Sequence, residues 1–208
     1  MLDLSVVVPS FNNRGHLIEV IRALELQQPP VREIIISHSG MGESVLSEYR
    51  PSIPCRLLHS DQPLKSGEAR NRGAELAMGE WLAFIDDDVI PAPNWTAQLL
   101  PLMEQDENNT CYVGSVDCDR SGGYWGLSLW FLEFGSVHSY MPSRVVEGGA
   151  SANMAMHREV YQRVGGFSEN LERCVDVDFM CRCRKAGART YFSSGLVVGH
   201  RNIPGMHH

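Results

Sequence analysis

Short apolar runs alternate with segments of helical spacing over the first 105 residues of the chain. The apolar runs predict strands at residues 4–8, 33–36, 55–58 and 81–85. The segments between and after them predict helices at residues 14–27, 43–50, 67–78 and 94–105. β-Branched runs of this length are typical of strands buried on both faces. Four strand–helix units in succession therefore favour an α/β fold with a mostly parallel central sheet flanked by helices.

The pattern after residue 110 is less regular. It predicts strands at residues 111–116, within 145–156, at 189–192 and at 196–198, and helices at 158–164 and about 176–186. Residues 122–135 hold Gly, Trp and Phe in an irregular order, and we predict that the apolar stretch 124–134 packs into the core. The alternatives are an acceptor-side surface and a membrane contact, which no basic flank supports. We expect one domain over residues 1–208, with halves at 1–110 and 111–208.

Charge and cysteine content exclude several classes of protein. The 208 residues include 18 basic and 25 acidic side chains, and the net charge of −7 argues against a nucleic-acid partner. No apolar stretch reaches about 18 residues, so no membrane-spanning helix is expected. The chain start lacks a basic segment before its apolar run, and the six cysteines lack CxxC spacing. We expect reduced thiols in a cytoplasmic protein, and leave peripheral contact with the cytoplasmic face of a membrane open.

Three consecutive aspartates, Asp86, Asp87 and Asp88, follow the predicted strand at residues 81–85. In sheets of this kind, ligands bind beyond the carboxyl ends of the strands. Alternate residues of an extended segment share a face, so Asp86 and Asp88 can point to one side. Two such carboxylates make a hard oxygen site for Mg²⁺ or Mn²⁺, which keeps positions open for substrate phosphates. The alternative is a solvated acidic turn that caps the next helix.

Two other strand ends carry residues suited to a nucleotide. Residues 66–73 form a small-residue turn that opens a helix, and its free N–H groups suit an anion. Arg70 can add a charge-assisted bond to a phosphate there, although a plain surface helix is the alternative. After the first strand, Phe11 can pack on a planar base and Asn12 can hydrogen-bond it. A helix start capped by Asn12 is the other interpretation.

The second half adds a pair of acids and a histidine. Asp176 and Asp178 begin a predicted helix. One of them can act as a general base while the other caps the helix or pairs with an arginine, but acids are also common in first helical turns. His200 follows the last predicted strand and is a candidate metal ligand, although a histidine at a strand end more often has a structural role.

Taken together, these motifs resemble those of family 2 glycosyltransferases, which have the GT-A fold and transfer a sugar with inversion of configuration at its anomeric carbon. The resemblance runs from Val6 to about Arg201, through residues 7–12, 67–73, 79–88, 148–155, 164–167, 176–178 and 199–200. It implies transfer of a sugar from a nucleotide-diphosphate donor to an acceptor hydroxyl, with a divalent cation, Mn²⁺ or Mg²⁺, as cofactor. It also implies a role in the synthesis of a polysaccharide, glycolipid or other glycoconjugate.

The resemblance assigns roles to the acids and the histidine. It implies that Asp86 and Asp88 are the DxD pair that holds the cation on the donor diphosphate. His200 matches a position that helps to bind the metal in some members of the family. Asp176 lies where the family has its catalytic base, and Asp178 is the fallback for that role.

The resemblance also implies a set of substrate contacts. Asp87 is expected to contact the ribose or the sugar of the donor, and Arg70 is expected to lie near the nucleotide. The further substrate contacts that the matched motifs imply are Pro9, Phe11, Asn12, Gly67 and Asn153. Residues 1–110 are then the nucleotide-binding half of the domain, and residues 111–208 are the acceptor-binding half.

Two departures from the family pattern keep other functions open. The family usually has an acidic residue after the second strand that contacts the nucleobase, and His38 or Ser39 stands in its place here. The base motif normally reads Glu-Asp, whereas Val175 precedes Asp176. These departures motivate an alternative, a non-catalytic domain that binds a sugar nucleotide on the same scaffold. A nucleotidyltransferase is a weaker alternative, because no glycine-rich loop follows the first strand.

Overall fold

The computed structural model describes residues 1–12, 16–40, 49–119 and 123–201. The strands are β1 (Leu4–Phe11), β2 (Glu33–Ser39), β3 (Cys55–Ser60), β4 (Trp81–Ile85), β5 (Val89–Pro91), β6 (Thr110–Cys118), β7 (Arg144–Val145), β8 (Asn153–His157) and β9 (Arg189–His200). The helices are α1 (Leu17–Glu25), α2 (Ser66–Leu76), α3 (Trp95–Gln105), α4 (Gly123–Phe134), α5 (Arg158–Val164) and α6 (Val175–Lys185). The predicted helix at 43–50 falls mostly outside the described residues.

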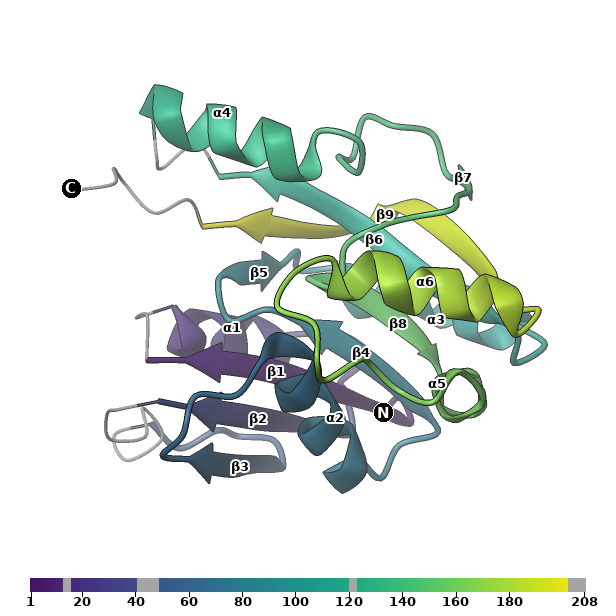
Figure 1. The fold of residues 1–208 in the computed structure, drawn as a ribbon. Helices are drawn as coiled ribbons and strands as arrows, with labels where there is room; N and C mark the ends of the chain where they lie inside the picture. Colours follow the sequence, from purple (N-terminus) through teal and green to yellow (C-terminus); the bar gives the residue numbers. More distant parts are fainter. Residues whose placement is uncertain (13–15, 41–48, 120–122, 202–208) are drawn as a thin grey trace.

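One sheet runs through both halves of the chain. In the described part of the chain its nine strands have the order β3-β2-β1-β4-β8-β6-β9-β5, and β7 pairs with β9 beside this path. The pairs β1–β2, β1–β4, β2–β3 and β6–β9 are parallel, and β8 runs antiparallel to both β4 and β6. The carboxyl ends of β1, β2, β4 and β9 therefore meet at one edge of the sheet, as Figure 1 shows.

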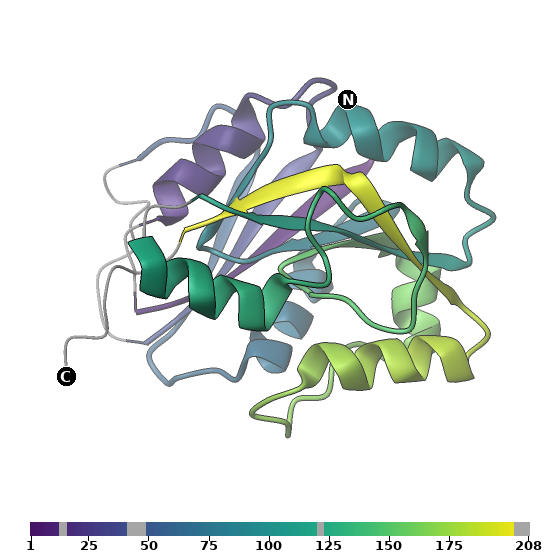
Figure 2. The same ribbon diagram turned by 90° about the horizontal axis from the view of Figure 1, so that it is seen from above.

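Helices cover both faces of the sheet because both faces are apolar. Side chains alternate along β1, so Val6 and Val8 enter one core while Val7 enters the other. α1 and α3 pack on the first face, and α2, α5 and α6 pack on the second (Figure 2). This arrangement confirms the predicted α/β fold, with a mostly parallel sheet flanked by helices.

Helix α4 differs from the prediction for residues 122–135. Its residues form a regular helix, in which the one buried residue is Gly126. Trp125 is 73% exposed and Leu132 is 81% exposed, so the predicted core packing of residues 124–134 is wrong. The reason is that α4 is apolar on all sides, while only one side packs against β6. Every helix of the described residues falls short of the length or hydropathy that crossing a bilayer requires.

Two smaller differences concern the strands of the second half. The strands predicted at 189–192 and 196–198 are one continuous strand, β9, and its pairing with β6 shifts register between Gly114 and Ser115. The short strand β5 is not predicted from the sequence, because its three residues are too few to show a pattern of apolar and polar positions. β5 nevertheless positions the acids, as described below.

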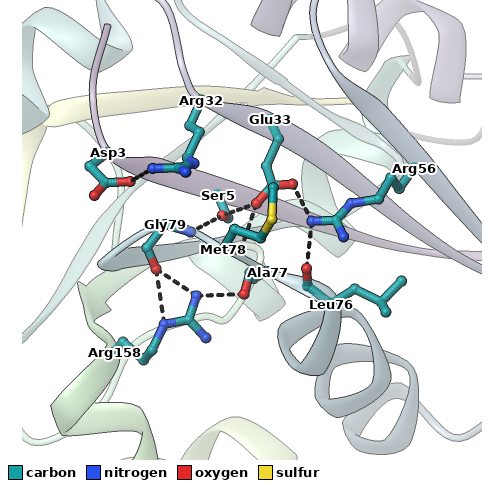
Figure 3. Close-up of polar contacts among 10 residues, drawn as sticks. All are labelled: Asp3, Ser5, Arg32, Glu33, Arg56, Leu76, Ala77, Met78, Gly79 and Arg158. Atoms are coloured by element: carbon teal, nitrogen blue, oxygen red, sulfur yellow. Dashed lines mark hydrogen bonds and ion pairs between the residues drawn. The ribbon is translucent and has the colours of Figure 1, made fainter.

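Figure 3 shows a polar network at the opposite edge of the sheet, where β2 begins. The buried Glu33 carboxylate accepts hydrogen bonds from Ser5 Oγ (2.6 Å), from the Met78 amide (2.7 Å) and from Arg56. Arg158, at the start of α5, donates to backbone carbonyls of the turn that follows α2. The network ties this turn to β1, β2 and α5, so it holds together the edge of the sheet that faces away from the candidate site.

Candidate functional site

The three aspartates Asp86, Asp87 and Asp88 form the turn between β4 and β5, which we call the acid turn. The Val89 amide donates to Asp86 O at 3.3 Å and closes this turn. β5 then pairs with the end of β9, which places Val89 opposite His200, and the Arg201 amide donates to Asp88 O at 2.8 Å. Two residues far apart in the sequence are thereby brought together: Asp88 Oδ2 lies 3.7 Å from His200 Nε2.

The two outer aspartates of the turn have different electrostatic surroundings. Burial, followed by repulsion from the Asp86 carboxylate, raises the pKa of Asp88 to about 6, and His200 offsets part of this rise. Asp86 is paired with Arg70, whose Nη2 donates to Asp86 Oδ1 at 2.5 Å. Arg70 is only 4% exposed, and its Nε lacks a hydrogen-bond partner within the described residues. Asp88 is therefore the carboxylate whose charge the protein compensates least.

The residues of the acid turn suit a divalent cation that takes some of its ligands from the protein and the others from a substrate. Asp86, Asp88 and His200 line the same cavity. Within the described residues, no three His, Cys, Asp or Glu side chains already form a metal-binding group. Sites for Mg²⁺ commonly use one or two carboxylates and take their other ligands from water and substrate phosphates. Hard carboxylate oxygens and the only partly compensated charge of Asp88 suit such a site.

A cavity of about 1070 Å³ extends from the acid turn to the start of α6. Its volume is at the upper end of the range for small-molecule sites. Besides the acid turn, its lining comes from residues 144–152 and 172–177 and from the segment around the end of α4. Both halves of the chain contribute, so the cavity can bring a ligand held at the acid turn next to groups of the second half.

Asp176 lines this cavity from the first turn of α6. Ser151 Oγ donates to Asp176 Oδ1 at 2.6 Å, and the Ser151 amide donates to Asp176 Oδ2 at 3.1 Å. Because Ser151 is only 2% exposed, the two bonds hold the Asp176 carboxylate in one orientation. Asp178 does not line the cavity, and hydrogen bonds from Ser168 (2.6 Å) and Arg182 (2.9 Å) lower its pKa.

A second cavity, of about 320 Å³, adjoins the acid turn at the ends of β1 and β2. Several residues predicted to bind the nucleotide line it: Pro9, Phe11, Ser39, Arg70 and Asp87. Asp86 and Asp88 line both cavities, so the acid turn lies between them. The structure thus brings together at this edge most of the residues that the sequence singles out in the first half.

His38 and Ser39 lie on opposite faces of β2. Ser39 lines the smaller cavity, and its Oγ accepts a hydrogen bond from the Leu64 amide at 3.2 Å. His38 is buried on the other face, with Nδ1 3.2 Å from Ser10 Oγ and its ring stacked on His59 at 5.5 Å. Of the two positions expected to meet a nucleobase, only Ser39 faces the cavity.

Asn153 lies in the interior and not at a cavity. It is 1% exposed, and its Oδ1 accepts a hydrogen bond from Trp95 Nε1 at 2.9 Å. Its Nδ2 donates to Ser115 O at 2.9 Å and to Leu196 O at 2.8 Å. These bonds occupy the amide and join β8 to the strands beside it. The structure therefore gives Asn153 a role in joining strands, and its expected substrate contact stays a prediction.

Gly67 and Asn12 also line neither cavity. A Cβ atom on Gly67 would lie 2.4 Å from Ser168 O, so the glycine allows α2 to pack closely against residue 168. Asn12 has a φ of 52° and lies against Gly40, where its side chain fills the space that a Cβ would need. The structure shows packing contacts for both residues, and their expected substrate contacts stay predictions.

Two residues of the site escaped individual prediction, Ser151 and Phe134. Ser151 falls inside the motif at 148–155, but only its hydrogen bonds with Asp176 reveal what it does. The Phe134 ring, at the end of α4, lies 5.1 Å from the His200 ring and lines the larger cavity. No pattern in the sequence predicts this contact, because it depends on where α4 packs.

Comparison with known proteins identifies relatives of the chain. The sequence profile described as "Glycosyl transferase family 2" matches residues 5–189. An uncharacterized glycosyltransferase of Haemophilus influenzae is 25% identical over 179 residues, which cover 86% of this chain and 61% of that protein. The chain thus spans less than two thirds of the length of this relative.

Solved structures share the fold. GalNAc-T7, solved with UDP, GalNAc and Mn²⁺, has a TM-score of 0.76 at 19% identity, covering 95% of this chain and 43% of its own. Residues 1–349 of Staphylococcus aureus TarS, solved with UDP-GlcNAc, give 0.74 at 14% identity, covering 100% of this chain and 60% of that one. These similarities confirm the predicted GT-A fold. Because the family profile covers most of the sequence, the chain belongs to glycosyl transferase family 2.

Proposed function

We propose that this protein transfers a sugar from a nucleotide-diphosphate donor to an acceptor hydroxyl, with inversion and with a divalent cation, in the synthesis of a glycoconjugate. One observation carries the proposal: a single cavity is lined by the acid turn at one end and by Asp176 at the other. Family membership supports it, as do the UDP and UDP-GlcNAc in two solved structures with the same fold.

The donor nucleotide occupies the smaller cavity in this proposal. Phe11 offers an aromatic face to the base, and Ser39 offers a hydroxyl in place of the usual acid. Asp87, from the same lining, hydrogen-bonds the ribose or the sugar. Arg70 neutralises Asp86 in the absence of a cation and lies beside the position assigned to the diphosphate.

Asp86, Asp88 and His200 are the residues that hold the cation in this proposal. A divalent cation bound there supplies positive charge that stabilises the departing nucleoside diphosphate. The Mn²⁺ in the GalNAc-T7 structure supports the choice of metal. The raised pKa of Asp88 supports the position, because a cation relieves the repulsion between Asp88 and Asp86.

Asp176 is the general base of the proposed reaction. It accepts the proton of the acceptor hydroxyl while the acceptor oxygen bonds to the anomeric carbon and the diphosphate leaves from the opposite face. The two hydrogen bonds from Ser151 orient the carboxylate toward the cavity. Asp178 is a poorer base, because Ser168 and Arg182 stabilise its ionised form.

The test is turnover of UDP-, GDP- and dTDP-sugars with Mn²⁺, measured as nucleotide release and sugar transfer across a panel of acceptors. Wild-type protein releases nucleotide, excess chelator stops the reaction, and Asp88→Ala abolishes turnover while its unfolding transition stays cooperative. Glu104→Ala, an exposed acid on α3, is the matched control and keeps full activity.

Two results would overturn the proposal. Full activity of Asp88→Ala, or of wild type in chelator, contradicts the metal site. Sugar-nucleotide binding in a calorimeter without turnover on any acceptor contradicts catalysis and leaves a binding domain as the function.

A further inference from the structure

Helix α4 exposes a continuous run of large apolar side chains. Tyr124, Trp125, Leu127, Leu129, Phe131 and Leu132 are each between 43% and 81% exposed. Figure 1 places the helix at the periphery of the molecule, alongside β6. We call these six residues the α4 face. Soluble proteins rarely expose apolar side chains in such a group unless something covers them.

The α4 face is held in place by the rest of the protein. Trp130, on the inner side of the helix, donates from Nε1 to Val116 O at 2.9 Å. Gly126, on the same helix, is buried. Since these contacts anchor one side of α4, the apolar side chains on the other side are presented outward by the fold itself.

The absence of charged side chains on the α4 face limits what can cover it. Residues 123–134 contain no Lys or Arg, and their one charged residue, Glu133, lies at the end of the helix where it lines the cavity. A partner that binds through charged groups would find nothing to pair with on this face. The matching surface is therefore uncharged, as the hydrocarbon layer of a membrane is.

The α4 face can enter a bilayer without a partner surface shaped to fit it. Insertion of a helix face into hydrocarbon requires no complementary shape, because each apolar side chain that leaves water contributes separately.

The residue types along α4 also suit a bilayer. Tyr124 and Trp125 begin the helix, and these side chains favour the interface between water and hydrocarbon. Leu129, Phe131 and Leu132 follow and have no polar atoms. Aromatic side chains with polar atoms at one end, beside side chains without polar atoms, are the arrangement expected of a helix that lies in the membrane surface.

The α4 face is continuous with the candidate site. Glu133 and Phe134, at the end of the helix, line the larger cavity, and the Phe134 ring contacts His200. An object that covers α4 is therefore next to the cavity in which the proposed acceptor meets Asp176.

We propose that the α4 face inserts into the hydrocarbon layer of a membrane and so holds the mouth of the larger cavity at the bilayer surface. This inference rests on the proposed function for its meaning, but its test does not require catalysis. It assigns the protein a membrane-bound state that depends on apolar insertion and not on charge.

The experiment is co-sedimentation of the full chain with vesicles of phosphatidylcholine alone, at low and at high salt. Wild type sediments with the vesicles at both salt concentrations. The double variant Trp125→Gln with Leu132→Gln binds about tenfold or more weakly, because two large side chains no longer leave water. The matched control, Leu26→Gln with Met78→Gln, changes two residues that are 75% and 60% exposed elsewhere and binds like wild type.

A second pair, Leu129→Gln with Phe131→Gln, is measured in the same way, so a folding defect in one variant does not decide the result. Wild type that stays in the supernatant overturns the inference, as does equal loss in the control. A wild-type dimer without lipid that both α4 pairs convert to monomer overturns it in favour of a second copy. Sugar-nucleotide hydrolysis with Mn²⁺ and no vesicles separates the two proposals. Its absence in wild type counts against the proposed function, whereas a wild type that hydrolyses the sugar nucleotide but does not bind vesicles counts against the membrane inference.

Discussion

Glu33 and Asp88 are carboxylates at opposite edges of the central sheet, and their surroundings shift their pKa values in opposite directions. Burial alone would raise the pKa of Glu33, but hydrogen bonds from Ser5, Met78 and Arg56 outweigh it and lower that pKa (Figure 3). Burial and a neighbouring carboxylate raise the pKa of Asp88 instead. The protein itself compensates the charge of Glu33, whereas His200 compensates the charge of Asp88 only in part.

In the proposed function, this difference separates a structural acid from one that binds a cation. A carboxylate that its own protein satisfies holds elements together, as Glu33 holds β2 to the turn after α2. A carboxylate kept close to another acid raises the free energy of the ligand-free protein, and binding a cation recovers that free energy. The same contrast occurs on α6, where Arg182 compensates Asp178 while Asp176 faces the cavity.

The largest expected effect tests the contrast on α6. Asp176→Asn removes the proposed base, so kcat should fall by about 10²- to 10⁴-fold while the KM for the donor stays within a factor of a few. Asp178→Asn should keep most of the kcat and lower the midpoint of unfolding instead. Steady-state kinetics and urea unfolding of both variants check this, and a larger kcat loss in Asp178→Asn would reverse the two roles.

The next effect concerns stability. Glu33→Gln should destabilise the protein by about 2–3 kcal/mol at pH 7.5, since Arg56 and the hydrogen-bond donors lose their ionised partner. The folded pKa of Glu33 lies below its unfolded value, so its stabilisation is present above the unfolded pKa and is lost as pH falls through the folded pKa. Urea unfolding at pH 7.5 and pH 4 should therefore show a smaller difference between wild type and variant at pH 4. Equal differences at both pH values would contradict this interpretation.

Asp88→Asn should act in the opposite direction on the metal-free protein. The folded pKa of Asp88 is raised to about 6, so ionisation of this group costs stability as pH rises through that value. In chelator at pH 8 the variant should be more stable than wild type by about 1–2 kcal/mol, and at pH 4 the two should be alike. Thermal unfolding with chelator and with Mn²⁺ checks this, because Mn²⁺ should stabilise only wild type. A wild type that is the more stable protein in chelator at pH 8 would show that Asp88 is compensated.

The smallest effect concerns the residue that positions the base. Ser151→Ala removes one of the two hydrogen bonds to Asp176 and keeps the backbone bond. The kcat should fall about tenfold, because the carboxylate loses one of the two bonds that orient it. Ser151→Thr should restore the kcat, since it keeps the hydroxyl. Steady-state kinetics of the three proteins check this, and an unchanged kcat in Ser151→Ala would leave Ser151 with packing alone.

The sequence predicts the acid turn well because strand–helix alternation fixes strand direction, which in turn fixes the edge where Asp86–Asp88 must lie. It predicts single side chains less well. Which of His38 and Ser39 faces the cavity depends on the register of β2, and one residue of shift exchanges them. Asn153 looks polar enough for a ligand, but its partners come from strands far away in the sequence. The exposure of α4 is also absent from the pattern, because apolar content alone does not say whether a neighbour exists to bury it.

The pairing of β5 with the end of β9 has a consequence for the order in which the site forms during synthesis of the chain. The acid turn leaves the ribosome early, but His200 and the Arg201 amide, which fix Asp88 in place, follow more than half a chain length later. A nascent chain therefore holds its aspartates without these neighbours until β9 is made. In the proposed function, the cation site becomes complete only when the end of β9 pairs with β5.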